Sequence, residues 1–424
     1  MDKRQVIVVT SSVRHVFIIG AKGISFYGGF ETFAAELLRG SCDMEEIRYY
    51  VACKKNGRGA MDLNSLEGLK KVDENHYLYM GALLSLVPVS EKLGAAQAIL
   101  YDLDSVKRAV AYCKKRQIPR PVFYFLTCRL GLFLGQAVKE IHKIRGSVYL
   151  NPDGLEWKRG KWSLPVRLYW KFAEKKSVEH ADMLVCDSEA IRKYITEKYS
   201  RFHPKTVFIP YGAVTETGAV LPEDQAAEKK WLDEHALSRG QYYLVVGRFV
   251  PENNVEVILR EFMKSKSERK LALVMTKDEK YRRKLQEKLH FDTDPRICFA
   301  GTVYNIKLLQ MIRSDAYAYI HGHSVGGTNP SLLESLAFTS LNLLYDVAFN
   351  RETALESGIY WTLKEGNLAG VIDLADRLPQ EQVRRYGNRA KQRIREEYYW
   401  QKICAEYEKL WKEDPGRREA ERQE

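Results

Sequence analysis

Residues 16–31, VFIIGAKGISFYGGFE, read as a buried strand, a glycine-bearing loop and the first turn of a helix that continues to Arg39. The paired Gly28 and Gly29 allow a backbone to approach a ligand closely. The N-terminus of the next helix favours an anion at the same place. The spacing is not GxGxxG, so the nucleotide-binding fingerprint is absent, and a plain tight turn is the alternative.

The same strand-then-helix unit recurs along the whole chain. Apolar runs lie at 47–52, 122–126, 147–151, 183–186 and 207–210, and again at 242–247, 271–276, 297–301, 316–322 and 341–345. Continuous apolar strands between helices predict parallel sheets covered on both faces, the doubly wound α/β class. A polar stretch at 215–240 separates two such domains, which we expect at 1–218 and 219–395, followed by a helical segment at 396–424.

The composition excludes several protein classes. The 424 residues are 45% hydrophobic and 29% charged, which rules out a disordered chain, a collagen-like fibre and a disulfide mini-scaffold. The net charge of +12 suits an anionic partner, either nucleic acid, anionic lipid or a phosphate-bearing substrate. Seven cysteines without a CxxC motif favour free thiols. With no signal peptide and no long apolar stretch, we expect a cytoplasmic protein that can sit on a membrane surface.

A charged and aromatic loop follows the run at 147–151. Residues 151–162, NPDGLEWKRGKW, gather Asp153, Glu156, Trp157 and Arg159. Aromatic rings that stack and carboxylates that accept hydroxyl protons suit sugar recognition. A salt-bridged loop held by its tryptophans is the alternative.

Two loops of the second half carry anion-binding features. Arg248, directly after an apolar run, can grip a phosphate in a bidentate way, although a capping turn around Asn254 is as good an interpretation. At 326–334, GGTNPSLLE, Pro330 suits a first helical turn, and the free amides of Thr328 to Ser331, Pro330 excepted, would then face outward and favour an anion. Glu334 follows one turn later, where its carboxylate could bridge two ribose hydroxyls.

Two patterns resemble metal sites but favour other interpretations. Asp102-Leu-Asp104 is a DxD pattern, yet Asp104 precedes a helical stretch and reads as an N-cap. His321 and His323 would share one face of a continued strand, but no third ligand is near in the sequence.

Taken together, residues 16–23 (VFIIGAKG), 27–33 (YGGFETF), 151–159 (NPDGLEWKR) and 326–334 (GGTNPSLLE) resemble a two-Rossmann-domain (GT-B) glycosyltransferase of family 4. The resemblance runs from about Arg14 to Trp411 and is closest to the bacterial rhamnosyltransferase branch. It leaves residues 1–13 unexplained. It implies a central cleft, an acceptor-binding first domain, a donor-binding second domain and a last helix that crosses back to the first.

The resemblance also assigns residues. Arg248 would bind the donor diphosphate, with Gly28 and Gly29 beside it, and Glu334 would hold the ribose. The implied donor set is completed by Lys22, Asn253, His323, Gly327, Thr328 and Asn329. Asp153 occupies a position where many relatives have histidine and is expected, with Arg248, to be catalytic. Glu156, Trp157 and Arg159 would help it to bind the acceptor.

Two positions depart from the broad family. Gly326 stands where the first glutamate of the E-x7-E motif belongs, which puts the usual contact to the donor sugar in doubt. Asn253 replaces a common lysine and removes one cation from the diphosphate site, a loss that helix amides or Lys22 could cover.

The implied reaction is a retaining, metal-independent transfer, with dTDP-L-rhamnose as the best donor and a polyprenyl-diphosphate-linked glycan as acceptor. No cofactor is expected. Basic segments at 107–116 and 159–176 are candidate contacts to an anionic membrane, and scattered solvated lysines are the alternative. Three other functions stay open: a sugar-nucleotide epimerase of the same fold, a non-catalytic glycan-binding relative and, without a supporting motif, a nucleic-acid-binding protein.

Overall fold

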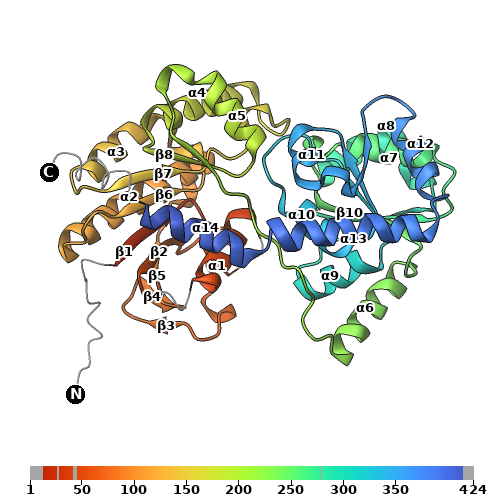
Figure 1. Cartoon of the computed structure of the whole chain (residues 1–424), viewed down its shortest axis with the longest axis horizontal. Helices are drawn as coiled ribbons and strands as arrows, with labels where there is room; N and C mark the ends of the chain where they lie inside the picture. The colour runs from red at the N-terminus through yellow and green to blue at the C-terminus, as the bar shows by residue number, and fades with distance from the viewer. Residues whose placement is uncertain (1–12, 26–27, 42–44, 277, 414–424) are drawn as a thin grey trace.

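The computed structural model describes residues 13–25, 28–41, 45–276 and 278–413. Tyr27, Cys42 and residues 1–12 of the unexplained N-terminal extension lie outside this part. The described chain forms two α/β units side by side, joined by two crossings (Figure 1). The first crossing runs from the first sheet to α6, and the second from α13 back to α14. Among the described helices, none combines the length and apolar character needed to cross a bilayer.

The first sheet has the strand order β3-β4-β5-β2-β1-β6-β7-β8-β9. Its strands are β1 Arg14–Ile19, β2 Ile47–Lys54, β3 Lys70–Lys71, β4 His76–Tyr79, β5 Ala82–Val87, β6 Val122–Phe125, β7 Ser147–Leu150, β8 Met183–Cys186 and β9 Thr206–Phe208. The helices of this unit, the first domain, are α1 Gly29–Gly40, α2 Gln97–Arg116, α3 Leu134–His142, α4 Leu164–His180 and α5 Glu189–Lys198. The expected parallel sheet is confirmed except at one edge, where β4 runs antiparallel to both neighbours.

The second sheet is parallel throughout, with the order β12-β11-β10-β13-β14-β15. Its strands are β10 Tyr242–Arg248, β11 Lys270–Thr276, β12 Ile297–Gly301, β13 Ala318–His321, β14 Asn342–Tyr345 and β15 Ile359–Trp361. Its helices are α6 Pro222–Glu234, α7 Val255–Lys264, α8 Glu279–Leu289, α9 Ile306–Asp315, α10 Pro330–Phe338, α11 Ala348–Ala354, α12 Asn367–Ala375 and α13 Gln380–Glu397. We call this unit the second domain.

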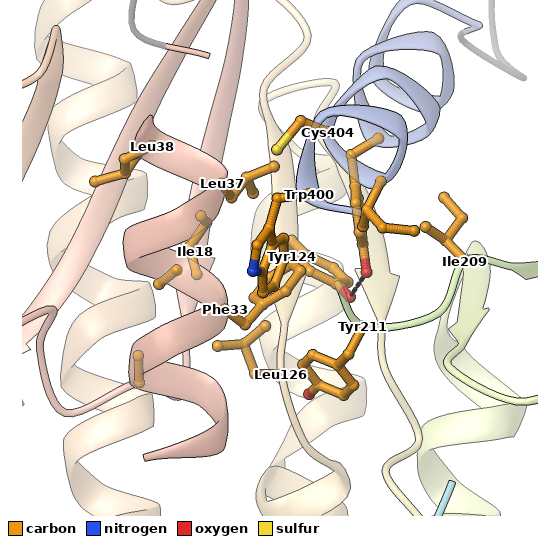
Figure 2. Close-up of a cluster of buried hydrophobic side chains, with 14 of the residues drawn as sticks. Ile18, Phe33, Leu37, Leu38, Tyr124, Leu126, Ile209, Tyr211, Trp400 and Cys404 are labelled. Atoms are coloured by element: carbon orange, nitrogen blue, oxygen red, sulfur yellow. Dashed lines mark hydrogen bonds between the residues drawn. The ribbon is translucent and has the colours of Figure 1, made fainter. Parts of the chain in front are cut away.

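The last helix, α14 (Trp400–Lys412), packs on the first domain beside α1 (Figure 1). Its aromatic residues are buried: the Tyr407 hydroxyl lies 2.9 Å from that of Tyr124, and the Trp411 indole donates to the Tyr49 hydroxyl at 3.1 Å. Figure 2 shows Trp400 and Cys404 in the same cluster as Phe33. The expected return of the last helix is thus confirmed.

One local expectation is wrong. α2 begins at Gln97, so Asp102 and Asp104 lie inside the helix, and Asp104 is not an N-cap. Asp102 is buried and accepts from the Arg129 guanidinium at 2.8 and 3.1 Å, while Asp104 pairs with Arg108 one turn later. Both carboxylates are therefore paired with arginine side chains of the first domain.

Candidate active site

The loops that follow the strands of both sheets meet at one seam between the domains. A side-chain carbon added at Gly154, after β7, would lie 2.1 Å from the Gly326 Cα, after β13. A carbon added at Gly160 would lie 3.5 Å from Pro251, after β10. Ligands of open α/β sheets bind outside the carboxyl ends of the strands, so this seam is the candidate site.

Gly326 takes a conformation that favours glycine, with φ at +152°. A side chain there would also meet the His323 ring nitrogen Nε2 at 2.9 Å. The absence of a glutamate at this position therefore has a steric reason: the loop packs backbone to backbone against Gly154 of the opposite domain.

A second set of contacts joins the domains beside this seam. Gly327 packs against the Asp187 carboxyl so closely that an added carbon would lie 1.9 Å from its Oδ1. The Thr328 hydroxyl donates to the Asp187 carbonyl. Glu352 of α11 accepts from the Ser188 hydroxyl at 2.8 Å and from the backbone N–H groups of residues 189 and 190 at 2.7 and 3.0 Å. A carboxylate of the second domain thus caps α5 of the first.

Asp153 lies at the tip of the loop after β7. Its backbone is left-handed, with φ at +55°, and its N–H donates to Asn151 Oδ1 at 2.8 Å. Its own Oδ1 accepts from the Gly154 N–H at 2.8 Å and lies 4.0 Å from Arg159 Nη2. The side chain keeps 22% of its exposure, so one face of this oriented carboxylate stays open toward a ligand.

The other predicted acceptor residues make extensive contacts within their own domain. Glu156 pairs with the buried Arg159 and accepts from the Trp162 indole at 2.8 Å. Trp157 donates to Glu174 at 3.1 Å, and Lys158, Lys171 and Lys198 lie over its ring. These contacts are those of a salt-bridged loop held by its tryptophans. Their role toward an acceptor stays a prediction.

Arg248 ends β10, and its side chain is exposed. Within the described ranges, its guanidinium makes no hydrogen bond and no ion pair. Walls from both domains partly exclude water, and this desolvation, followed by the field of the nearby Arg159 cation, lowers the pKa of Arg248. Lys161 is also near, and its pKa is lowered chiefly by burial. Cations of both domains thus lie near each other, with the carboxylates of Glu252, Glu156 and Asp153 also close to Arg248.

Asn253 and His323 form a pair behind Arg248. His323 Nδ1 lies 2.8 Å from Asn253 Oδ1, and the Asn253 amide donates to the Arg248 carbonyl at 2.7 Å. Burial, followed by the field of Arg159, holds the pKa of His323 well below its ordinary value, so the ring is neutral. Asn253 therefore fixes the backbone that carries Arg248.

The loop before α10 partly contradicts the expected anion site. The Asn329 side chain caps the helix and accepts from the Ser331 N–H at 2.9 Å. Contrary to the expectation, the Ser331 N–H is therefore not available to an anion. Glu334 pairs with the buried Arg313 at 2.7 Å and keeps 21% of its side-chain exposure. Arg313 orients the carboxylate proposed to hold a ribose.

The loop after β1 stands apart from this group. The Lys22 N–H donates to Glu31 Oε1 at 3.1 Å, and a side chain at Gly28 would collide with Glu31 Oε2 at 2.2 Å, whereas one at Gly29 would meet nothing within 4 Å. Contacts among the described residues do not join Lys22, Gly28 or Gly29 to Arg248. Their place in the donor site stays a prediction.

Two buried carboxyl groups were missed by the sequence analysis. Asp187 follows β8, and burial, reinforced by the charges of Asp153 and Glu352, raises its pKa to about 8. Neither carboxylate oxygen of the buried Glu252 has a hydrogen-bond partner in the described part of the chain. The signal for Asp187 was its position directly after a strand, which places it at the ligand-binding edge.

No group of three or more His, Cys, Asp or Glu side chains in the described ranges is arranged to hold a metal ion. The rings of His321 and His323 lie 6.1 Å apart between centroids, and His323 is engaged by Asn253.

Comparisons with known proteins agree on the architecture. Residues 13–214 match the family described as Domain of unknown function (DUF1972). No curated protein matches the sequence. The solved structures that resemble it include sucrose-phosphate synthase from Thermosynechococcus elongatus, with a TM-score of 0.73 at 16% identity over 94% of this chain and 98% of that one. A glycosyltransferase from Rickettsia africae gives 0.69 at 13% identity over 95% and 99%. An Anabaena protein solved in complex with UDP gives 0.65 at 12% identity over 94% and 99%.

These likenesses span both sheets and the helix that returns to the first. The identities are low, so the likeness concerns the fold. The chain has the GT-B fold of these solved structures, and residues 13–214 match the DUF1972 family model.

Proposed function

We propose that this chain is a retaining, metal-independent glycosyltransferase that moves a sugar from a nucleotide donor to a lipid-linked glycan. The best donor is dTDP-L-rhamnose, and cell-surface polysaccharide synthesis at the inner face of the cytoplasmic membrane is the proposed setting. The donor class is supported by two solved structures of the same fold: the Anabaena protein in complex with UDP and an Escherichia coli protein bound with UDP-2-fluoro glucose.

One observation carries the proposal. Arg248 stands at the carboxyl end of β10, without a hydrogen bond or ion pair in the described part of the chain, and faces Arg159 across the seam. Arg159 already pairs with Glu156, whereas Arg248 keeps its guanidinium donors available to an anion. A diphosphate supplies that anion and accepts bidentate hydrogen bonds from a guanidinium.

The chemistry then rests on placement and charge stabilisation. Arg248 neutralises the departing diphosphate, and Glu334, oriented by Arg313, holds the ribose. Asp153 orients the acceptor hydroxyl or shares its proton, while the leaving diphosphate oxygen takes that proton at the end of the transfer.

A thermal-shift titration with dTDP, UDP, GDP and ADP, in EDTA, tests this function. A ligand at about 100 times its Kd adds about 2.7 kcal/mol to the free energy of unfolding. We expect dTDP to stabilise the protein, and Arg248→Ala and Glu334→Ala to reduce the shift strongly. Stabilisation by UDP instead would keep a transferase and discard rhamnose. No shift with any nucleotide would contradict the function and favour a glycan-binding protein.

A further inference from the structure

The outer face of the first domain carries exposed apolar side chains on two neighbouring elements. On α4, Leu164, Leu168 and Phe172 follow one another at intervals of four residues and are 67%, 60% and 38% exposed. On the short 3₁₀ segment before α3, Leu132 and Phe133 are 60% and 42% exposed. We call these five residues the α4 patch. Clusters of exposed large apolar residues mark interaction surfaces on soluble proteins.

The two elements are in direct contact. A side-chain carbon added at Gly131 would meet the Ala173 Cβ at 2.6 Å, and the Tyr169 hydroxyl donates to the Arg129 carbonyl at 2.7 Å. Figure 1 shows α4 along the outer margin of the first domain, with no other element of the drawn chain beyond it.

Positive charge surrounds the α4 patch. Residues 157–176 contain seven Lys and Arg and a single acid, Glu174. Glu174 is buried and faces inward, where it accepts from Trp157, Tyr194 and Tyr199. The outward face therefore presents leucine and phenylalanine beside cations such as Lys171 and Lys175, and the next acid of the helix, Glu179, pairs with Lys176 at 2.8 Å.

The patch adjoins the loop that carries Asp153. Lys171 lies 5.3 Å from the Trp157 ring centroid, and the Arg167 guanidinium donates to the Trp157 carbonyl at 2.8 Å. A surface that rests on α4 would therefore lie next to the acceptor side of the seam.

We infer that the α4 patch is the surface by which this protein docks on an anionic lipid bilayer, with Leu164, Leu168 and Phe172 entering the interface and Lys171 and Lys175 facing the lipid phosphates. An apolar stripe flanked by cations is the composition of helices that lie in the plane of a membrane. Charge selects a bilayer over a second copy of this chain, because two copies would bring their cations together. The inference extends the proposed function by placing its lipid-linked acceptor, but docking needs no donor.

Co-sedimentation of the full chain with vesicles tests the inference. We expect binding to phosphatidylcholine vesicles that contain 30% phosphatidylglycerol, weakened by salt, and little binding to phosphatidylcholine alone. Leu164→Glu with Leu168→Glu should lower partitioning by more than about 100-fold. Lys171→Gln with Lys175→Gln should lower it by about 25-fold, at about fivefold per cation.

The matched controls lie on the second domain. Leu374→Glu, at a residue 52% exposed on α12, and Lys284→Gln on α8 should leave vesicle binding unchanged. Because all four variant positions of the patch are on the surface, circular dichroism should show the native fold.

Three results would overturn the inference. These are no binding to anionic vesicles, binding that survives Leu164→Glu with Leu168→Glu, or a dimer in light scattering that this double variant dissolves. The dTDP and UDP titrations on the same variants separate this inference from the proposed function: vesicle binding without a nucleotide shift would keep the docking surface and discard the transferase.

Discussion

The loop after β7 and the end of β10 face each other across the seam, yet their charged side chains differ in how many partners they have. In the β7 loop, Glu156 pairs with Arg159 and Lys161 and accepts from Trp162, so its charge is shared among partners within the loop. At the end of β10, Arg248 has no such partner in the described chain. The difference indicates that the β7 loop is fixed by its own contacts and that the Arg248 guanidinium is available to a ligand.

The strongest way to break this comparison is to keep the two loops apart. Gly154→Ala places a carbon 2.1 Å from the Gly326 Cα. Because both contacting atoms belong to backbone, the clash is relieved only if the two domains move apart. We expect transfer activity to fall by about 100-fold, the typical effect of a displacement of about 1 Å between reacting groups. Small-angle scattering should show a more open particle. Gly370→Ala, at a helical glycine with nothing within 4 Å, is the control and should change neither. A closed, active Gly154→Ala protein would refute the seam.

Removing the Glu156 carboxylate tests whether the β7 loop is stabilised by its own ion pairs. Glu156→Ala leaves Arg159, which is 6% exposed, without its nearest carboxylate. We expect the free energy of unfolding to fall by about 3 kcal/mol, as for other broken buried pairs, measured by denaturant titration. Glu381→Ala, in the exposed pair with Arg385, should have no measurable effect. Equal effects in the two variants would mean that the loop is not stabilised by its own charges.

Arg248→Ala tests the open side and should give the reverse pattern. No hydrogen bond or ion pair in the described chain is lost, so the melting temperature of the free protein should stay unchanged. Affinity for the nucleoside diphosphate should fall by about 10- to 100-fold, the value of a charge-assisted hydrogen bond. Calorimetric titration measures both enthalpy and Kd. A destabilised variant with unchanged affinity would make Arg248 a structural residue.

The last prediction concerns pH. Burial raises the pKa of Asp187 to about 8, against about 3.9 in the unfolded chain. Protonation of this carboxyl therefore stabilises the folded state. Its contribution is complete below about pH 4 and is lost as the pH rises through about 8. Asp187→Asn should therefore raise the melting temperature at pH 8.5 more than at pH 5. A constant difference at the two pH values would contradict this assignment.

Much of the fold followed from local pattern, and the failures have physical causes. Continuous apolar runs identified the buried parallel strands, such as β1 and β10, because both of their faces are covered. The antiparallel edge was missed because β4 is half-exposed and has no such run. The start of α2 was missed because its N-cap, Ala96, makes no side-chain cap.

The candidate site was predicted less completely, because tertiary partners leave no local signal. Arg248 and Asp153 were identified by their places after strands, where ligands bind. The capping of α5 by Glu352 joins residues more than 160 positions apart, and only the folded chain brings them together. For the same reason, the sequence analysis interpreted Asn253 only as the loss of a cation. Its amide in fact donates to the Arg248 carbonyl and fixes that backbone.

A crystal structure of the complex with dTDP or UDP tests the central claim most directly. The account predicts the diphosphate at the seam, with the Arg248 guanidinium within hydrogen-bond distance of its oxygens and a Glu334 oxygen on the ribose hydroxyls. A nucleotide bound elsewhere, or one in the seam that touches neither side chain, would contradict it.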